Sequence, residues 1–121
     1  MTKYNARKTT VRGIKFDSKL EANRYLVLLS AQQQGRIAEL SLQPKFTLQD
    51  GFRDARGKKH RAITYKADFA YKTPCGSIVI EDAKGVQTPV FKLKKKLLLH
   101  KYPEINFRLF KATSSIGLLE E

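Results

Sequence analysis

Several residue types are scarce in this sequence, and each scarcity narrows the classes of protein to which it can belong. A single cysteine excludes an intramolecular disulfide and favours a reduced, cytoplasmic setting. With that one cysteine and two widely spaced histidines, we expect no zinc site. No apolar run approaches the roughly 20 residues that a membrane-spanning helix needs, so we expect no membrane partner. Internal repeats and Gly-rich phosphate-binding loops are also missing.

Acidic residues are few, and this makes both the charge balance and the positions of the acids informative. Asp and Glu total 11 against 24 Lys and Arg, which gives a formal net charge of +13. A folded domain this basic repels itself unless an anion binds it, and nucleic acid is the usual partner. A ribosomal or packaging protein that binds nucleic acid without chemistry has the same balance, so that alternative stays open.

The length and the periodicity of the sequence predict one α/β (α+β) domain over residues 1–121. We expect a flexible basic arm at 1–10 and a loose tail at 112–121. Two helices are predicted, one from Asp17 or Ser18 to Gly35 and one from Thr88 to residue 100 or 101. Extended segments are predicted at 10–16, 36–42, 45–48, 61–72, 77–84 and 104–111, with a basic loop or hairpin tip at 50–60. These elements make a mixed central sheet flanked by helices, in the order α-β-β-β-α-β.

Two acids are predicted to meet across a β-hairpin. Residues two apart in a strand share a face, so Asp82 and Lys84 project side by side at a strand end, whereas Glu81 faces the other way and receives no metal role. The preceding strand carries Asp68, and a tight turn brings it near Asp82. Neighbouring carboxylates repel unless a cation lies between them, and Mg²⁺ prefers such oxygen ligands. Alternatively, each acid pairs with a local Lys or Arg.

The third candidate acid, Glu21, lies on the apolar side of the first helix. Its spacing from Ser18 is that of a capping box, so Glu21 is either a cap or a metal ligand, and the two roles are partly compatible.

Basic residues that suit phosphate contacts fall in two groups. The first group is in the loop at 50–60 and just beyond it: Arg53, Arg56, Lys58, Lys59 and Arg61. The second is on the helix at 88–101, where we expect an apolar stripe of Val90, Phe91, Leu93, Leu97 and Leu98. Lys94 falls inside this stripe, as a lysine at the rim of the core or one that reaches a phosphate. Lys92, Lys95 and Lys96 fall outside it, on a solvated or backbone-contacting face.

In order along the chain, these pieces resemble the PD-(D/E)XK nuclease superfamily. Glu21 is on the first helix, Asp68 on a strand, and Asp82-Ala83-Lys84 on the next strand, before a helix and a strand. The segments 13–21, 42–46, 65–69 and 81–85 are also similar to a family of small phage-type proteins of unassigned function. Members of that family resemble junction resolvases and transposition endonuclease subunits. Ala67, where the superfamily label has Pro, is a common variation.

The resemblance implies a restriction-endonuclease-like core and a catalytic set of Glu21, Asp68, Asp82 and Lys84. Asp68, Asp82 and the Ala83 carbonyl would hold Mg²⁺ or Mn²⁺, with Glu21 binding directly or through water. The implied function is a metal-dependent DNA endonuclease, selective for branched DNA such as Holliday junctions, in a phage-infected or prophage-bearing host. We expect a homodimer. The alternatives are a non-catalytic basic nucleic-acid-binding module and a nuclease subunit that needs a partner protein.

Overall fold

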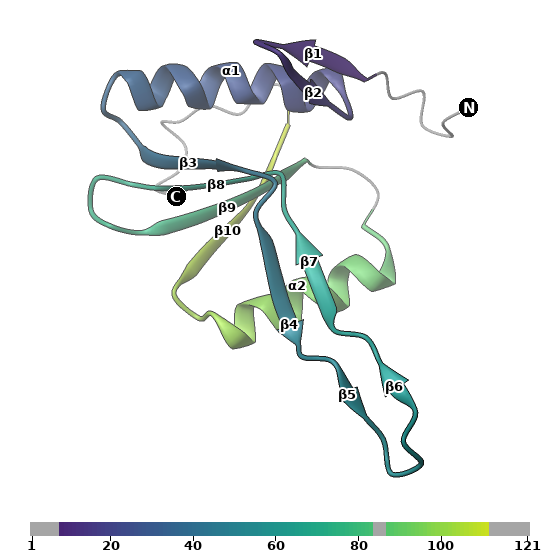
Figure 1. The fold of residues 1–121 in the computed structure, drawn as a ribbon. Helices are drawn as coiled ribbons and strands as arrows, with labels where there is room; N and C mark the ends of the chain where they lie inside the picture. Colours follow the sequence, from purple (N-terminus) through teal and green to yellow (C-terminus); the bar gives the residue numbers. More distant parts are fainter. Residues whose placement is uncertain (1–7, 84–86, 112–121) are drawn as a thin grey trace.

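A computed structural model describes residues 8–83 and 87–111 and is organised around a four-stranded sheet (Figure 1). The sheet has the order β10-β9-β8-β3, with β3 at Ala38–Leu42, β8 at Phe69–Lys72, β9 at Ile78–Ala83 and β10 at Ile105–Phe110. Strands β9 and β10 are parallel, and the other neighbours are antiparallel. The sheet is therefore mixed, and the predicted α/β (α+β) class with a central hairpin between β8 and β9 is confirmed.

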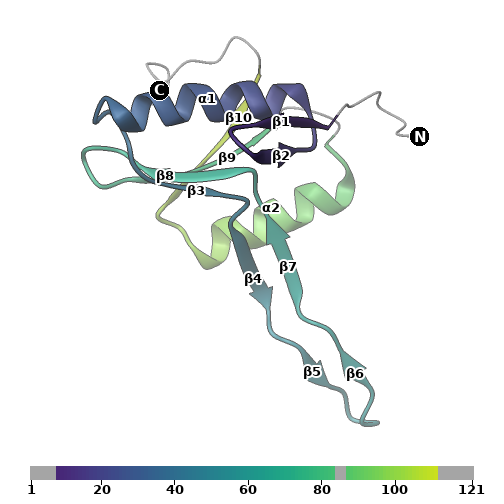
Figure 2. The ribbon, with the colours of Figure 1, turned by 45° about the horizontal axis from the view of Figure 1, so that its top comes forward.

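Helix α1, at Lys19–Gln33, covers one face of the sheet (Figures 1 and 2). It begins where predicted, because the Ser18 side chain accepts a hydrogen bond from the backbone N–H of Glu21 and so caps an unpaired donor of the first turn. The helix ends at Gln33 with Gln34 as its C-cap, and Gly35 follows with a φ of +76°, a conformation that glycine adopts without strain. The core beneath α1 contains Leu28 and Phe69, among other buried residues.

Helix α2, at Pro89–Lys101, covers the opposite face (Figure 1). Thr88 caps it, and Pro89 stands at its first position, as the sequence predicted. The predicted apolar stripe is wrong by a rotation about the helix axis, because Val90 and Leu93 are exposed. The residues that pack on the core beneath α2 are Phe91, Leu98, Leu99 and Tyr102.

The segment 61–72 is predicted as one strand, but the structure divides it. Strand β7, at Ile63–Lys66, pairs with β4, at Lys45–Gln49, and belongs to a different sheet from β8. The break falls at Ala67 and Asp68. Side chains of one parity consequently change sides: Tyr65 packs on the α2 side, whereas Phe69 packs on the α1 side. Periodicity alone cannot reveal this, since the alternation continues through the break.

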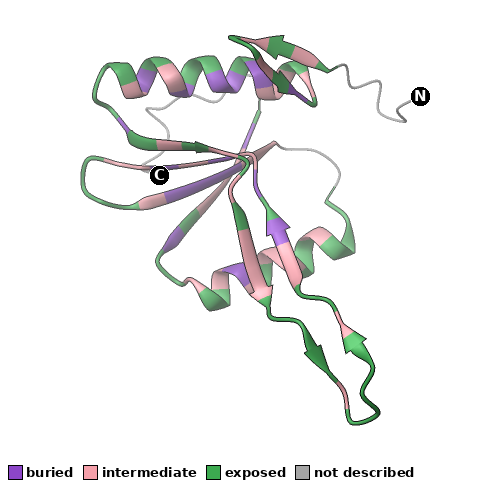
Figure 3. Ribbon diagram, viewed as in Figure 1, coloured by how far each residue is buried: buried purple, intermediate pink, exposed green. Residues whose placement is uncertain are grey.

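Beyond β4 and β7 the chain continues outward as a narrow hairpin of β5, at Phe52–Arg53, and β6, at Lys59–His60 (Figures 1 and 2). The predicted hairpin tip at 50–60 is therefore present. We call residues 50–62 the arm. Figure 3 shows that it is largely exposed, in contrast to the buried centre of the sheet.

A second small hairpin precedes α1. Strands β1, at Thr9–Val11, and β2, at Ile14–Phe16, are joined by Arg12 and Gly13, which both have positive φ, as a type I′ turn requires. The expected arm at 1–10 thus overlaps a strand, and residues 1–7 and the tail at 112–121 lie outside the described residues. The expected order α-β-β-β-α-β omits this hairpin and the strands that carry the arm.

Candidate functional site

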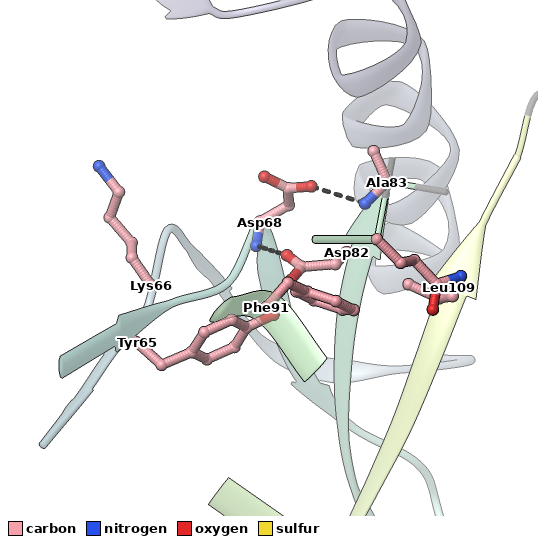
Figure 4. Close-up of a pocket in the computed structure, with 8 residues that line it drawn as sticks. Tyr65, Lys66, Asp68, Asp82, Ala83, Phe91 and Leu109 are labelled. Carbon is pink, nitrogen blue, oxygen red and sulfur yellow. Dashed lines mark hydrogen bonds between the residues drawn. The ribbon is translucent and has the colours of Figure 1, made fainter. Parts of the chain in front are cut away.

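Asp68 and Asp82 lie together at the point where the chain leaves the central sheet (Figure 4). Each carboxylate binds backbone next to the other acid. The backbone N–H of Asp68 donates to Asp82 Oδ1 at 2.7 Å, and the backbone N–H of Ala83 donates to Asp68 Oδ2 at 2.8 Å. These two bonds fix both carboxylates, and the predicted meeting of Asp68 with Asp82 across the hairpin is confirmed.

The break that holds Asp68 is braced by the facing segment of the chain. The backbone N–H of Gln43 donates to the Asp68 carbonyl at 2.9 Å, and the backbone N–H of Ala67 donates to the Pro44 carbonyl at 3.0 Å. Gln43 has a φ of +50°, which is uncommon for a residue with a side chain. Two strands therefore turn out of the sheet side by side, and their hydrogen bonds fix the position of Asp68.

Glu21 contributes both to the cap of α1 and to the acidic group. Its Oε2 accepts a hydrogen bond from Ser18 Oγ at 3.1 Å, which differs from the usual capping box, where the glutamate reaches the N-cap backbone. Burial and the nearby Asp68 carboxylate raise the pKa of Glu21 to about 7. The predicted role of Glu21 at the helix start thus has a structural basis, and Glu21 also interacts electrostatically with Asp68. Its role as a metal ligand stays a prediction.

The pKa values of all three acids are raised above their ordinary values. Burial raises the pKa of Asp82 to about 6, and burial also raises the pKa of Asp68 above its ordinary value. Within the described residues, neither acid forms an ion pair with Lys or Arg, so the alternative of local pairing is not what the structure shows. Carboxylates that are buried together without a counter-charge are stabilised by a bound cation.

The neighbouring acid, Glu81, shows a different arrangement, which the sequence reasoning missed. It is fully buried on the α1 side, and both of its oxygens accept hydrogen bonds from Arg24 at 2.7 Å. The Tyr71 hydroxyl also donates to Glu81. A signal was available in the sequence: Glu81 alternates with the apolar residues Val79 and Ala83 on one strand face, and a glutamate on such an inward face requires a buried cation as its partner.

A pocket of about 280 Å³ opens beside the two aspartates (Figure 4). Besides Asp68 and Asp82 it is lined by Tyr65, Gln87 and Phe91, among others. Tyr65 is only 6% exposed, yet its hydroxyl has no hydrogen-bond partner. A buried hydroxyl without a partner costs free energy, so a polar group from a ligand or water is expected to bind it. The sequence pattern of 61–72 does not single out Tyr65, because alternation does not distinguish a core residue from a residue of a pocket wall.

The donor atoms of the pocket suit a hard divalent metal. Asp68 and Asp82 supply carboxylate oxygens, which Mg²⁺ and Mn²⁺ prefer. Among the residues that the structure describes, each of the two acids has one oxygen that accepts no backbone hydrogen bond. In the part of the chain that the structure describes, no three His, Cys, Asp or Glu side chains converge closely enough to hold a metal ion. The pair of aspartates therefore fits one side of a metal site, which Glu21, the Ala83 carbonyl and water could complete. Lys84 lies outside the described residues.

The predicted DNA-contacting residues occupy two separate surfaces. Those in the first group are exposed on the arm: Arg53, Arg56, Lys58, Lys59 and Arg61. On α2, Lys92 and Lys96 are exposed and Lys94 is half-buried, as predicted. Lys95 was placed on the solvated face, and this is wrong: its ammonium lies 4.9 Å from the centre of the Phe107 ring, so its stem packs against the core.

The comparisons with known proteins identify a family without assigning a function. A family model described as "Protein of unknown function (DUF1064)" matches residues 1–115. No curated protein and no solved structure matches the chain. Among the described residues, no helix is both long enough and apolar enough to cross a membrane.

Proposed function

The chain belongs to the DUF1064 family of proteins of unknown function, and we propose that it is a metal-dependent DNA endonuclease that hydrolyses phosphodiester bonds, with a preference for branched DNA. The observation that carries the proposal is the pair of hydrogen bonds that hold Asp82 on the Asp68 N–H and Asp68 on the Ala83 N–H, beside a pocket and, among the described residues, without an ion pair to Lys or Arg. A protein that is otherwise strongly basic keeps these acids together, although they repel one another.

The proposed chemistry divides between a bound metal and the side chains around the pocket. Mg²⁺ or Mn²⁺, held by Asp68, Asp82 and the Ala83 carbonyl with help from Glu21, would lower the pKa of a bound water and neutralise charge at phosphorus. Glu21, with a pKa of about 7, can accept or release a proton near neutral pH. The unpartnered Tyr65 hydroxyl can donate a hydrogen bond to a phosphate oxygen. Lys84, by the resemblance to the nuclease superfamily, would orient the attacking water and stabilise the transition state.

The proposed substrate follows from charge and size. A net charge of +13 favours a polyanion, and the basic residues lie both on the arm and on α2. One small domain has little room for a separate module that reads base sequence, so we propose recognition of DNA shape, by a homodimer that spans a junction. The setting proposed for this activity is the cytoplasm of a phage-infected or prophage-bearing bacterium.

Cleavage of matched substrates tests the proposal. Purified protein is incubated with a labelled four-way junction and with linear duplex of the same sequence, in Mg²⁺, Mn²⁺ or EDTA. We expect metal-dependent cutting of the junction, reduced at least about 1,000-fold in Asp82→Asn and Asp68→Asn. Glu104→Gln is the matched control, because Glu104 is an exposed acid just before β10 and outside the arm, and this variant should keep cutting. Tight binding without cutting in any metal, with or without a partner protein, would contradict the nuclease proposal.

A second candidate function is a basic nucleic-acid-binding module without catalysis. The position of the arm favours it, because five exposed cations project on a structure that is separate from the acidic pair (Figure 1). The two candidates differ in what the aspartates do. In a pure binder, Asp68→Asn and Asp82→Asn should leave DNA affinity unchanged or increase it, and Mg²⁺ should not stabilise the protein.

A further inference from the structure

The arm contributes no residue to either hydrophobic core cluster, in contrast to the domain that carries it. Its base is held by the domain: Phe46 and Leu48 of β4 pack in the α2-side core, and Lys101 Nζ donates to the Thr47 carbonyl at 2.6 Å. Beyond that base, β5 and β6 pair only with each other. Phe52 is 49% exposed and belongs to neither core cluster.

The tip of the arm is fixed by Asp54, the acid at its centre. Asp54 Oδ1 accepts from the backbone N–H groups of Arg56 and Lys58 at 2.9 and 3.0 Å, and Oδ2 contacts His60 Nε2 at 2.9 Å. The His60 contact, followed by the Lys58 N–H, holds the pKa of Asp54 below its ordinary value. Gly57, with a φ of +81°, completes the turn. The one acid of the tip is therefore used internally. Arg53 Nη1 donates to the Gly57 carbonyl at 3.0 Å, which orients its guanidinium, and the cations of the tip are exposed to a partner.

Glycine also allows the two chains of the arm to lie close together near its base. A Cβ added to Gly51 would lie 3.0 Å from the His60 carbonyl oxygen and 3.3 Å from the Ala62 backbone nitrogen. Both neighbours are backbone atoms, so a larger residue at 51 would force the strands apart. The arm is thus a slender and preorganised element.

The register gives the arm two chemically different faces. Phe52 pairs with His60, and Arg53 pairs with Lys59. Directly opposed residues share a face and adjacent residues do not, so the aromatic pair and the basic pair lie on opposite sides. The rings of Phe52 and His60 are stacked, with centroids 4.7 Å apart and an interplanar angle of 15°. One face thus presents cations, and the other presents a flat aromatic surface.

We propose that the arm is a wedge that enters DNA at a branch point, with Arg53 and Lys59 on the phosphates of one strand and the Phe52–His60 pair stacked on a base exposed at the branch. Linear duplex DNA can bind only the basic face of the arm, because its bases are stacked inside the helix and its phosphates are exposed. A base that can stack on an aromatic side chain is available where strands separate. The two faces together therefore match a branch, where a backbone and an unpaired base lie close together.

This inference deepens the proposed function and rests on it for the identity of the ligand. Its test measures binding in EDTA, where no metal-dependent cleavage occurs. The probes are a four-way junction with 2-aminopurine at the branch and a linear duplex with 2-aminopurine at the same place. We expect the wild-type protein to quench the fluorescence of the junction, because stacking quenches this base, and to leave the duplex signal unchanged.

The variant that removes the aromatic face is Phe52→Ala. Since stacking on one base contributes roughly a factor of 10 or more in affinity, we expect about a 10-fold weaker affinity for the junction and loss of quenching. Affinity for the duplex should change less than about 2-fold, and Phe52→Trp should restore both properties. Val90→Ala is the matched control, because Val90 is also an exposed apolar residue, on α2, and it should change neither affinity. The midpoint of urea unfolding shows that each variant is folded.

The basic face is tested with Arg53→Gln and Lys59→Gln. Each should weaken binding to junction and duplex alike and should reduce the slope of log affinity against log salt by about one. An equal effect of Phe52→Ala on both substrates, no effect on either, or no quenching by the wild type would overturn the wedge.

The wedge and the nuclease can fail separately. If the wild type cuts the junction in Mg²⁺ and Phe52→Ala binds and cuts it equally well, the wedge is wrong and the nuclease stands. If junction binding depends on Phe52 but no metal supports cutting, the wedge stands and the nuclease is wrong.

Discussion

Glu81 and Asp82 are adjacent in β9, yet they lie in opposite kinds of environment. Glu81 faces α1, where Arg24 binds both of its oxygens and the Tyr71 hydroxyl adds a third hydrogen bond. Asp82 faces the pocket on the other side, where its Oδ1 accepts a hydrogen bond from the Asp68 backbone N–H and its pKa is raised to about 6. Because consecutive strand residues point to opposite faces, a shift of one position separates an acid paired with arginine from one that pairs with no Lys or Arg among the described residues.

The difference separates structural acids from candidate functional acids. A buried carboxylate with a complete set of partners can take no ligand without losing an existing bond. A carboxylate with a free oxygen, a raised pKa and an adjacent pocket can bind a cation at little structural cost. By this criterion Asp82, Asp68 and Glu21 form the candidate site, and Glu81 is part of the scaffold that orients β9 beneath α1.

The largest expected effect on stability concerns the buried pair of Arg24 and Glu81. Arg24→Met leaves Glu81 buried without its cation, and we expect a loss of about 3–5 kcal/mol in the free energy of unfolding. Adding Glu81→Leu to that variant should recover most of the loss, because the pair is then replaced by apolar groups. Urea unfolding of the single and double variants measures both effects. A single variant as stable as the wild type would contradict the assignment of Glu81 as structural.

A smaller effect is expected from the acids beside the pocket, which should make the protein less stable as the pH rises. The folded-state pKa values of Asp82, about 6, and Glu21, about 7, lie above the ordinary values of 3.8 and 4.5. The stabilisation from their protonated forms is complete below those ordinary values and is lost as the pH rises through 6 and 7. We therefore expect the metal-free protein to lose about 1–3 kcal/mol between about pH 4 and about pH 8.

Asp82→Asn isolates the contribution of one acid to this pH dependence. In urea unfolding, the variant should lose less stability than the wild type over that pH range, and Mg²⁺ should stabilise the wild type at about pH 8 but not the variant. Glu81 cannot serve as a control because its substitution removes the buried ion pair with Arg24, so Glu104→Gln, at an exposed acid outside the arm, is the better comparison. A wild type that is equally stable across the range, or one that Mg²⁺ does not affect, would remove the distinction between the two acids.

The smallest expected effect on stability is at Tyr65, whose hydroxyl is buried without a partner. Tyr65→Phe removes that unsatisfied group, so we expect stability to stay the same or to rise by up to about 1 kcal/mol. If the hydroxyl contacts the substrate phosphate, kcat for junction cutting should fall about 10-fold with little change in KM. Tyr71→Phe is the contrasting variant, because it removes a partner of Glu81 and should lower stability. A Tyr65→Phe enzyme with unchanged kcat would show that the hydroxyl is only a core feature.

Local rules applied to the sequence located the helices and most of the strands. Ser18 and Thr88 cap the two helices as their positions indicated, and Gly35 follows the end of the first helix. The same rules placed Asp68 and Asp82 opposite each other, because two apolar strands joined by a tight turn form a β-hairpin. Caps, turns and alternation depend on residues near one another in sequence, and for that reason they can be read directly.

Only the tertiary structure decided which elements share a sheet and which side chains receive partners. The break at Asp68 requires the facing break at Gln43, which lies far away in sequence. It places β7 in the two-stranded sheet with β4 at the base of the arm, while β8 stays in the central sheet. The rotation of α2 about its axis also depends on long-range packing, which leaves Lys95 half-buried against Phe107 and Leu93 exposed. The sequence by itself determined which acids lie at the strand ends. Long-range packing determined that Arg24 neutralises Glu81 and that no described cation reaches Asp82, because burial and charge pairing depend on distances between segments that the local pattern does not encode.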